Sequence, residues 1–148
     1  MVGEEKQCQE RLKRYFPDIT PSNSRCTSPA TYNYNCIAWA YERDNVWIQP
    51  GFFWPIHQEE CSIEAYIELF SSIGYIHCED TAYEEGFQKI VLYIKDGRLT
   101  HAARQLPTGK WTSKLGSDID IEHDYPEVLN GNDYGVASIF MKRKIDKF

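Results

Sequence analysis

The chain has 148 residues, of which 42% are hydrophobic and 14% aromatic, so it suits one folded domain and is not an intrinsically disordered chain. Its formal net charge is −6, which disfavours nucleic-acid and anionic-membrane partners because both are bound through basic surfaces. No apolar run approaches the roughly 20 residues of a membrane-spanning helix, and the N-terminus lacks the apolar core of a signal peptide. We expect a single domain over residues 1–148 that is cytoplasmic, or is exported by a route independent of a signal peptide.

The chain contains an odd number of cysteines: Cys8, Cys26, Cys36, Cys61 and Cys78. Without a signal peptide, this number favours free thiols over a disulfide framework. Zinc-ligand types occur at His57, Cys61, His77 and Cys78. The adjacent His77 and Cys78 would not share one metal ion, because neighbouring residues of a strand point to opposite faces. We therefore expect no metal and no organic cofactor.

The N-terminal third is predicted to be a helix followed by a loop. Apolar residues at helical spacing, ending at Pro17, predict an amphipathic helix over residues 4–16. Residues 17–33 are rich in Pro, Ser, Thr and Asn, which indicates a loop.

Two further helices are predicted before residue 75. The run from Asn35 to Tyr41 is apolar on every side, which predicts a short buried helix at about residues 35–43. An aromatic loop follows, and then residues 62–73 have helical apolar spacing, with Ser62 as N-cap and Gly74 as the stop.

The second half changes to the period of strands, and we expect a sheet over residues 89–142. Residues 90–94 form a continuous apolar run that is typical of a strand buried on both faces. Asp96-Gly97 is a strong hairpin signal. The further strands are expected at Leu99–Gln105, Trp111–Leu115 and Tyr134–Lys142. The predicted fold class is α+β, with helices packed on one side of an antiparallel meander.

Cys36 is the strongest candidate for chemistry. It is expected in the first turn of the buried helix, where the positive end of the helix dipole and free backbone N–H groups favour a nucleophilic thiolate. The same N–H groups could stabilise an oxyanion beside the sulfur, and Asn33 or Asn35 could add a side-chain donor. The alternative interpretation is that Cys36 is a small core residue.

His101 is the second candidate. It lies on the strand after the Asp-Gly turn, among small neighbours that leave room for an imidazole to face a cleft. It could take the proton of Cys36 as a general base. The alternative is a structural histidine held within the sheet.

A third group should orient the imidazole, and the hairpin register suggests candidates. If Thr108-Gly109 are the central turn residues, Lys114 shares the face of His101, where it could assist a nearby thiol or bind a substrate carboxylate. Lysine cannot accept a hydrogen bond, so we expect the orienting group among the carboxylates just past the strand. These are Asp118, Asp120 and Glu122, of which we favour Asp118. A bulge at the turn would bring Ser113 onto that face instead.

A Cys-bearing helix followed by a hairpin strand bearing His resembles the papain-like cysteine hydrolases, especially the small NlpC-type amidase domains. Four segments also resemble a group of short, uncharacterised bacterial domains: Tyr34–Ala40, His101–Gln105, Trp111–Gly116 and Ile121–His123. The first resemblance implies a papain-like fold, with Cys36 as nucleophile and His101 as base.

We therefore expect a cysteine-dependent hydrolase or acyl transferase that acts on an amide bond of a peptide or protein substrate. The alternative is a non-catalytic protein-interaction module on the same scaffold, such as a partner of a toxin or of a secretion system. Its acidic charge and aromatic residues would suit a protein partner.

Overall fold

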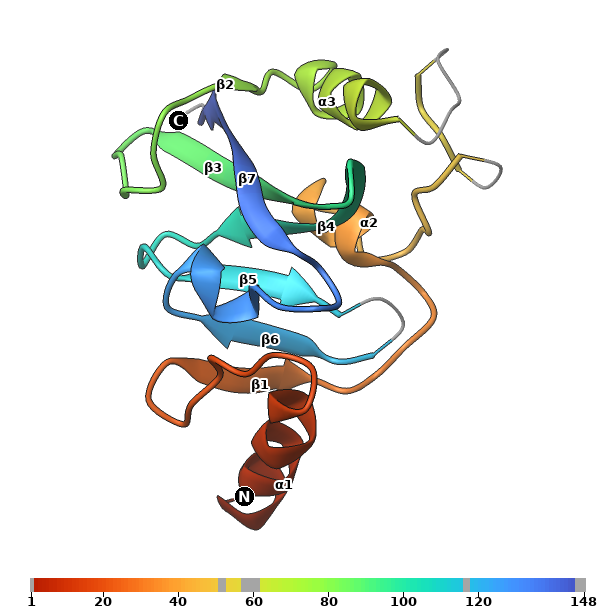
Figure 1. Ribbon diagram of the computed structural model, residues 1–148. Helices are drawn as coiled ribbons and strands as arrows, with labels where there is room; N and C mark the ends of the chain where they lie inside the picture. The colour runs from red at the N-terminus through yellow and green to blue at the C-terminus, as the bar shows by residue number, and fades with distance from the viewer. Residues whose placement is uncertain (1, 51–52, 57–61, 116–117, 146–148) are drawn as a thin grey trace.

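The computed structural model describes residues 2–50, 53–56, 62–115 and 118–145 (Figure 1). It is an α+β fold, as expected, built on a seven-stranded antiparallel sheet with the order β1-β6-β5-β4-β3-β7-β2. The helical elements are α1 (Val2–Lys13), α2 (Cys36–Ala40), α3 (Ile63–Ser71) and the 3-10 helix η1 (Pro126–Leu129). The strands are β1 (Ser24–Ser28), β2 (Ile76–His77), β3 (Phe87–Lys95), β4 (Arg98–Gln105), β5 (Trp111–Lys114), β6 (Asp120–His123) and β7 (Val136–Lys144).

The sheet separates two hydrophobic cores. On the face that we call the α2 face, Ile90 and Leu92 of β3 pack with residues of α2 and α3. On the opposite face, the α1 face, Val91 and Tyr93 pack with Leu12 of α1 and with η1. The central strand β3 is therefore buried on both sides, as its continuous apolar run predicts.

The N-terminal prediction is correct for the helix and wrong for the loop. α1 ends at Lys13, three residues before the predicted end, and Leu12 is buried as expected. The segment predicted as loop contains the edge strand β1, which pairs with β6. The expectation of free thiols is wrong for Cys8 and Cys26, which form a disulfide between α1 and β1.

The predicted hairpin is confirmed. Asp96 and Gly97 both have positive φ, at 52° and 75°, as the two central residues of a type I′ turn require. β3 and β4 pair across this turn, with Tyr93 opposite His101.

The remainder of the sheet differs from a simple meander. β3 to β6 follow one another, but the last strand, β7, returns to pair with β3 on its other side. Residues 120–123 were expected to lie between the strands Trp111–Leu115 and Tyr134–Lys142, but they form the strand β6 and pair with β5.

The register between β4 and β5 is shifted by one residue from the expected one. Gln105 pairs with Trp111 and Arg104 with Thr112, so five residues connect the two strands. A slip of one residue moves every side chain of β5 to the other face. Lys114 and Thr112 therefore lie on the α2 face, and Ser113 lies on the face of His101.

Candidate functional site

Cys36 is the first residue of α2, in the first turn as predicted. Because the helix has only five residues, its macrodipole stabilises a thiolate at Cys36 only weakly. The individual backbone N–H groups contribute more to that stabilisation. Ile37 and Ala38 pack into the core of the α2 face, which holds the start of the helix against β4 and β5.

Asn35 does not have the expected role of an oxyanion donor. Its side-chain oxygen caps α2 by accepting from Ala38 N at 3.0 Å and also accepts from Ile48 N at 3.2 Å. Its amide nitrogen donates to Ile48 O at 2.8 Å. All of these bonds are buried, so Asn35 ties the Cys36 turn to the Ile48 segment.

The thiol of Cys36 is surrounded by groups that favour its ionised form. Hydrogen bonds from the backbone of Ala102, Ile37 and Cys36 itself lower its pKa, and so does the charge of Lys114. Burial outweighs them and raises the pKa of the Cys36 thiol to about 11. The resting sulfur is thus a thiol at neutral pH, held among thiolate-stabilising groups.

Lys114 is a buried cation on the α2 face. Its side chain is fully buried, and its ammonium donates to Thr31 O at 3.0 Å and to the backbone carbonyl of Asp118. It also lies over the ring of Tyr34, 5.2 Å from the centroid. Burial lowers the pKa of Lys114, while the charges of Asp120, Asp118 and Cys36 act in the opposite direction.

We call the group of Cys36, Tyr34, Lys114 and Asp120 the cluster around Cys36. Asp120 is its buried carboxylate. The hydroxyl of Tyr34 donates to it at 2.5 Å, and the Ser28 side chain is a further hydrogen-bonding partner. Burial raises the pKa of Asp120, against the opposing effects of Tyr34, Lys114 and Ser28. Sequence reasoning named Asp120 only as one of several acceptors, because the strand β6 that turns it inward was not recognised.

The structure does not bring His101 into contact with Cys36. The imidazole is fully buried on the α1 face, stacked on Tyr134 at 4.1 Å and 5.1 Å from the ring centre of Tyr93. Neither ring nitrogen has a hydrogen-bond partner among the described residues. The expected Cys36–His101 hydrogen bond is therefore not formed, because the neighbour of His101, Ala102, is the residue of β4 that faces α2.

Asp118 does not orient the imidazole either. Its carboxylate accepts two bonds from the guanidinium of Arg11 in α1, at 2.7 and 3.1 Å. Arg11 holds the pKa of Asp118 below its usual range. The contribution of Asp118 to the site is its backbone carbonyl, which accepts from Lys114.

A second buried histidine was not anticipated as part of the core. His123 Nε2 lies 2.8 Å from Ser113 Oγ, and His123 Nδ1 lies 3.1 Å from the carbonyl of Tyr125. A carbonyl only accepts, so Nδ1 carries the proton and Nε2 accepts from the serine. Ser113 and His123 are both fully buried, which assigns this pair to the packing of the α1 face.

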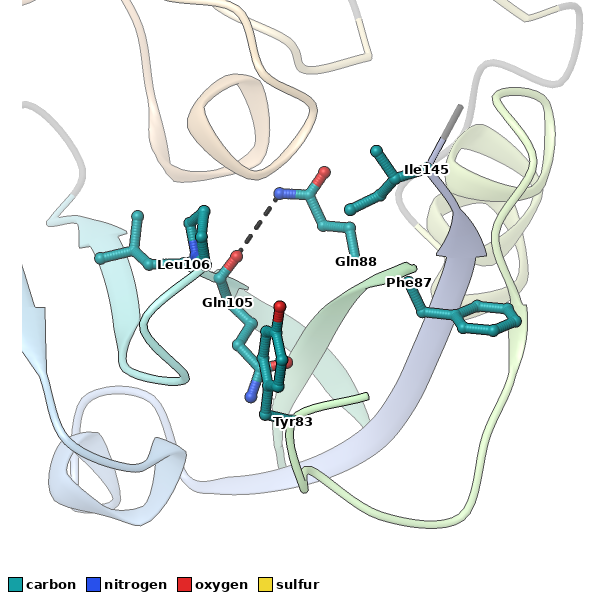
Figure 2. A pocket seen from close by; sticks show the side chains of 7 residues that line it. Tyr83, Phe87, Gln88, Gln105, Leu106 and Ile145 are labelled. Atoms are coloured by element: carbon teal, nitrogen blue, oxygen red, sulfur yellow. Dashed lines mark hydrogen bonds between the residues drawn. The ribbon is translucent and has the colours of Figure 1, made fainter. Parts of the chain in front are cut away.

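Figure 2 shows a small pocket at the C-terminal end of β4. Its volume is about 60 Å³. The Gln88 amide donates to Gln105 O across it at 3.4 Å. Its lining residues are Tyr83, Phe87, Gln88, Gln105, Leu106, Pro107 and Ile145. None of these belongs to the cluster around Cys36.

Within the described residues, no group of three His, Cys, Asp or Glu side chains is arranged to hold a metal ion. His57 and Cys61 lie outside those residues. None of the helices in the described part of the chain has the length and apolar character needed to cross a bilayer.

Comparison with known proteins identifies a family but no activity. No curated protein and no solved structure matches the chain. The family model described as "Domain of unknown function (DUF7689)" matches residues 25–142, a range that includes Cys36, Lys114 and Asp120. The chain therefore belongs to the DUF7689 family.

Proposed function

We propose that this protein is a cysteine-dependent hydrolase or acyl transferase that acts on an amide bond of a peptide or protein, with Cys36 as the nucleophile. The observation that carries the proposal is the convergence of backbone N–H groups and of the Lys114 charge on one sulfur. Donors placed there for a thiolate also lie beside the position where the oxyanion of a tetrahedral intermediate forms.

In the proposed reaction, sulfur attacks the carbonyl carbon, the C–S bond forms and the C–N bond breaks. The proton lost by the thiol leaves on the amine product. Water or a second amine then cleaves the thioester and returns the thiol. Lys114 takes the place of His101 as the charged partner of the sulfur, because it lies on the α2 face and the imidazole does not.

The arrangement of a Cys-bearing helix against an antiparallel sheet supports a papain-like ancestry of the scaffold. In this proposal the cation beside the sulfur comes from β5, and the strand that follows it, β6, supplies Asp120. His101, which the resemblance implies as the base, packs on the opposite face of the sheet, against Tyr93 and Tyr134.

A non-catalytic protein-interaction module is the second candidate. Two observations favour it: the pKa of about 11 at Cys36, and a His101 that has no hydrogen bond to the sulfur. Such a module would keep Cys36 as a packing residue and would use exposed side chains for its partner.

Acyl trapping separates the two candidates. The protein is incubated with p-nitrophenyl acetate and its cysteine peptides are analysed by mass spectrometry, with the partly exposed free thiol of Cys78 as internal reference. The enzyme proposal predicts that Cys36 is acetylated faster than Cys78 and that the acetyl group on Cys36 is then hydrolysed. It also predicts that Cys36 is acetylated more slowly in Lys114→Met than in the wild type. Acetylation of Cys78 with none at Cys36 would reject it in favour of the module.

A further inference from the structure

We propose that the Cys8–Cys26 disulfide is a redox switch that sets the reactivity of Cys36 through Arg11, Asp118 and Lys114. The inference rests on the proposed function, since it concerns the regulation of the same sulfur. Each step as far as Lys114 is a contact between described residues, and the last step is the charge of Lys114 acting on the sulfur.

The disulfide holds α1 against the edge strand β1. Cys8 lies on α1 and Cys26 on β1, and both residues are partly exposed, so a reductant can reach them. Within the part of the chain that the structure describes, two other residue pairs make polar contacts between these elements. Glu5 accepts from Cys26 N at 3.1 Å, and the amide of Gln9 donates to Ser24 O at 2.7 Å.

From α1 the connection passes to the loop before β6. Arg11, three residues after Cys8, makes its two hydrogen bonds to Asp118 from the same helix. The side chains of this ion pair are 45% and 37% exposed, so the pair is weak by itself and depends on the position of α1. A helix that is no longer tethered would release it readily.

From Asp118 the connection reaches the sulfur. The backbone carbonyl of Asp118 accepts from the buried ammonium of Lys114, whose charge acts on Cys36. The other half of the disulfide leads to the same ammonium, because the segment after β1 contains Thr31, whose carbonyl also accepts from it. Both ends of the disulfide therefore lead to the groups that hold Lys114 in place.

The redox step is a thiol–disulfide exchange with a dithiol. The Cys8–Cys26 bond accepts two electrons and two protons and becomes two thiols, while the dithiol is oxidised to its own disulfide. Reduction would loosen α1, break the Arg11–Asp118 pair and weaken the hold on Lys114. The ionised form of Cys36 would then be less favoured.

The test compares the rate of iodoacetamide alkylation at Cys36, followed by peptide mass spectrometry at pH 9, in four proteins. These are the oxidised wild type, the double variant Cys8→Ser/Cys26→Ser, Arg11→Gln with the disulfide intact, and Lys13→Gln as a matched control on the exposed side of α1. We expect Cys36 to react roughly three- to tenfold more slowly in the double variant and in Arg11→Gln, because its rate follows the thiolate fraction. Lys13→Gln should react like the wild type.

An unchanged alkylation rate of Cys36 in Arg11→Gln would overturn the proposed switch. If the double serine variant does not fold, the result with Arg11→Gln is the test of the proposal. An unchanged rate in a folded double variant would overturn it as well. The acyl-trapping experiment distinguishes failure of the switch from failure of the proposed enzyme. A Cys36 that is acylated equally in oxidised and reduced protein rejects the switch alone, whereas a Cys36 that is never acylated rejects the proposed enzyme alone.

Discussion

Two buried histidines on the α1 face show how hydrogen bonding decides the role of a residue. His123 has a partner at each ring nitrogen, Ser113 on one side and the carbonyl of Tyr125 on the other. His101 is equally buried and contacts two tyrosine rings, but neither of its nitrogens has a partner among the described residues. An unpaired buried polar atom is destabilising, whereas a paired one contributes to stability.

We therefore expect His101→Leu and His123→Leu to differ in stability. In His101→Leu, the removal of two unpaired nitrogens offsets the lost ring stacking, so the free energy of unfolding should change by less than about 1 kcal/mol. His123→Leu leaves the Ser113 hydroxyl and the Tyr125 carbonyl unpaired and should cost about 2–3 kcal/mol. Urea unfolding measures both, and equal costs would show that His101 has polar partners that this account omits.

Asn35 and Ser62 are the N-caps of α2 and α3. The sequence predicted the cap at Ser62, whereas Asn35 was expected inside its helix. Each accepts from the backbone N–H three residues later, Asn35 from Ala38 and Ser62 from Ala65. Asn35 has a second function, because it also pairs with both backbone groups of Ile48. The α2 cap is therefore also a tertiary contact.

Alanine substitution at the two caps should separate these functions. Ser62→Ala removes a cap alone and should cost about 1 kcal/mol. Asn35→Ala removes the cap and leaves the buried N–H and carbonyl of Ile48 unpaired, so it should cost about 3 kcal/mol or more. Equilibrium unfolding in urea gives both values, and similar costs would contradict the role assigned to the Ile48 contacts.

The β4–β5 connection marks the limit of sequence reasoning at this scale. The strands themselves were predicted, because Asp96-Gly97 and the apolar alternation are local signals. The preferred register was wrong by one residue, because Pro107 to Lys110 fit a shorter turn as well as the five-residue connection that forms. The alternative, which brings Ser113 onto the face of His101, is the one observed. That slip moved Lys114 from the face of His101 to the face of Cys36, and so changed the expected partner of the sulfur.

At the scale of the whole molecule, the two buried histidines make stability depend on pH. Burial lowers the pKa of His123 from 6.5 to about 4 and that of His101 well below 6.5. As the pH falls through 6.5, these histidines become protonated in the unfolded state but stay neutral in the folded state. The free energy of unfolding therefore decreases as the pH drops toward 4. Above pH 6.5 both states are neutral at these sites and the effect vanishes.

Each histidine should lower the free energy of unfolding by up to about 1.4 kcal/mol per pH unit in this window. Urea unfolding at a series of pH values checks the slope. His101→Leu should reduce the slope, because it removes one of the two imidazoles whose pKa is lowered by burial. A wild-type stability that stays flat between pH 6.5 and 4.5 would contradict the burial of both imidazoles.

The general architecture could be predicted from the sequence, but its edges could not. The double-sided burial of β3 follows from an uninterrupted apolar run, and the helices follow from their spacing and caps. β1 and β6 are short and carry charged residues, Arg25 and Glu122, that pair with each other across the strands. Such strands resemble loops locally. The Cys8–Cys26 disulfide depends on the position of β1 beside α1, which no local pattern reveals.

The most direct test of the central claim is the pH profile of iodoacetamide labelling at Cys36 in the wild type, Lys114→Met and His101→Leu. The wild type should titrate with an apparent pKa near 11. Lys114→Met should move the profile to higher pH, because it removes the charge that lowers the thiol pKa, and His101→Leu should leave the profile in place. A profile that moves with His101→Leu and not with Lys114→Met would contradict this account and restore the imidazole as the partner of the sulfur.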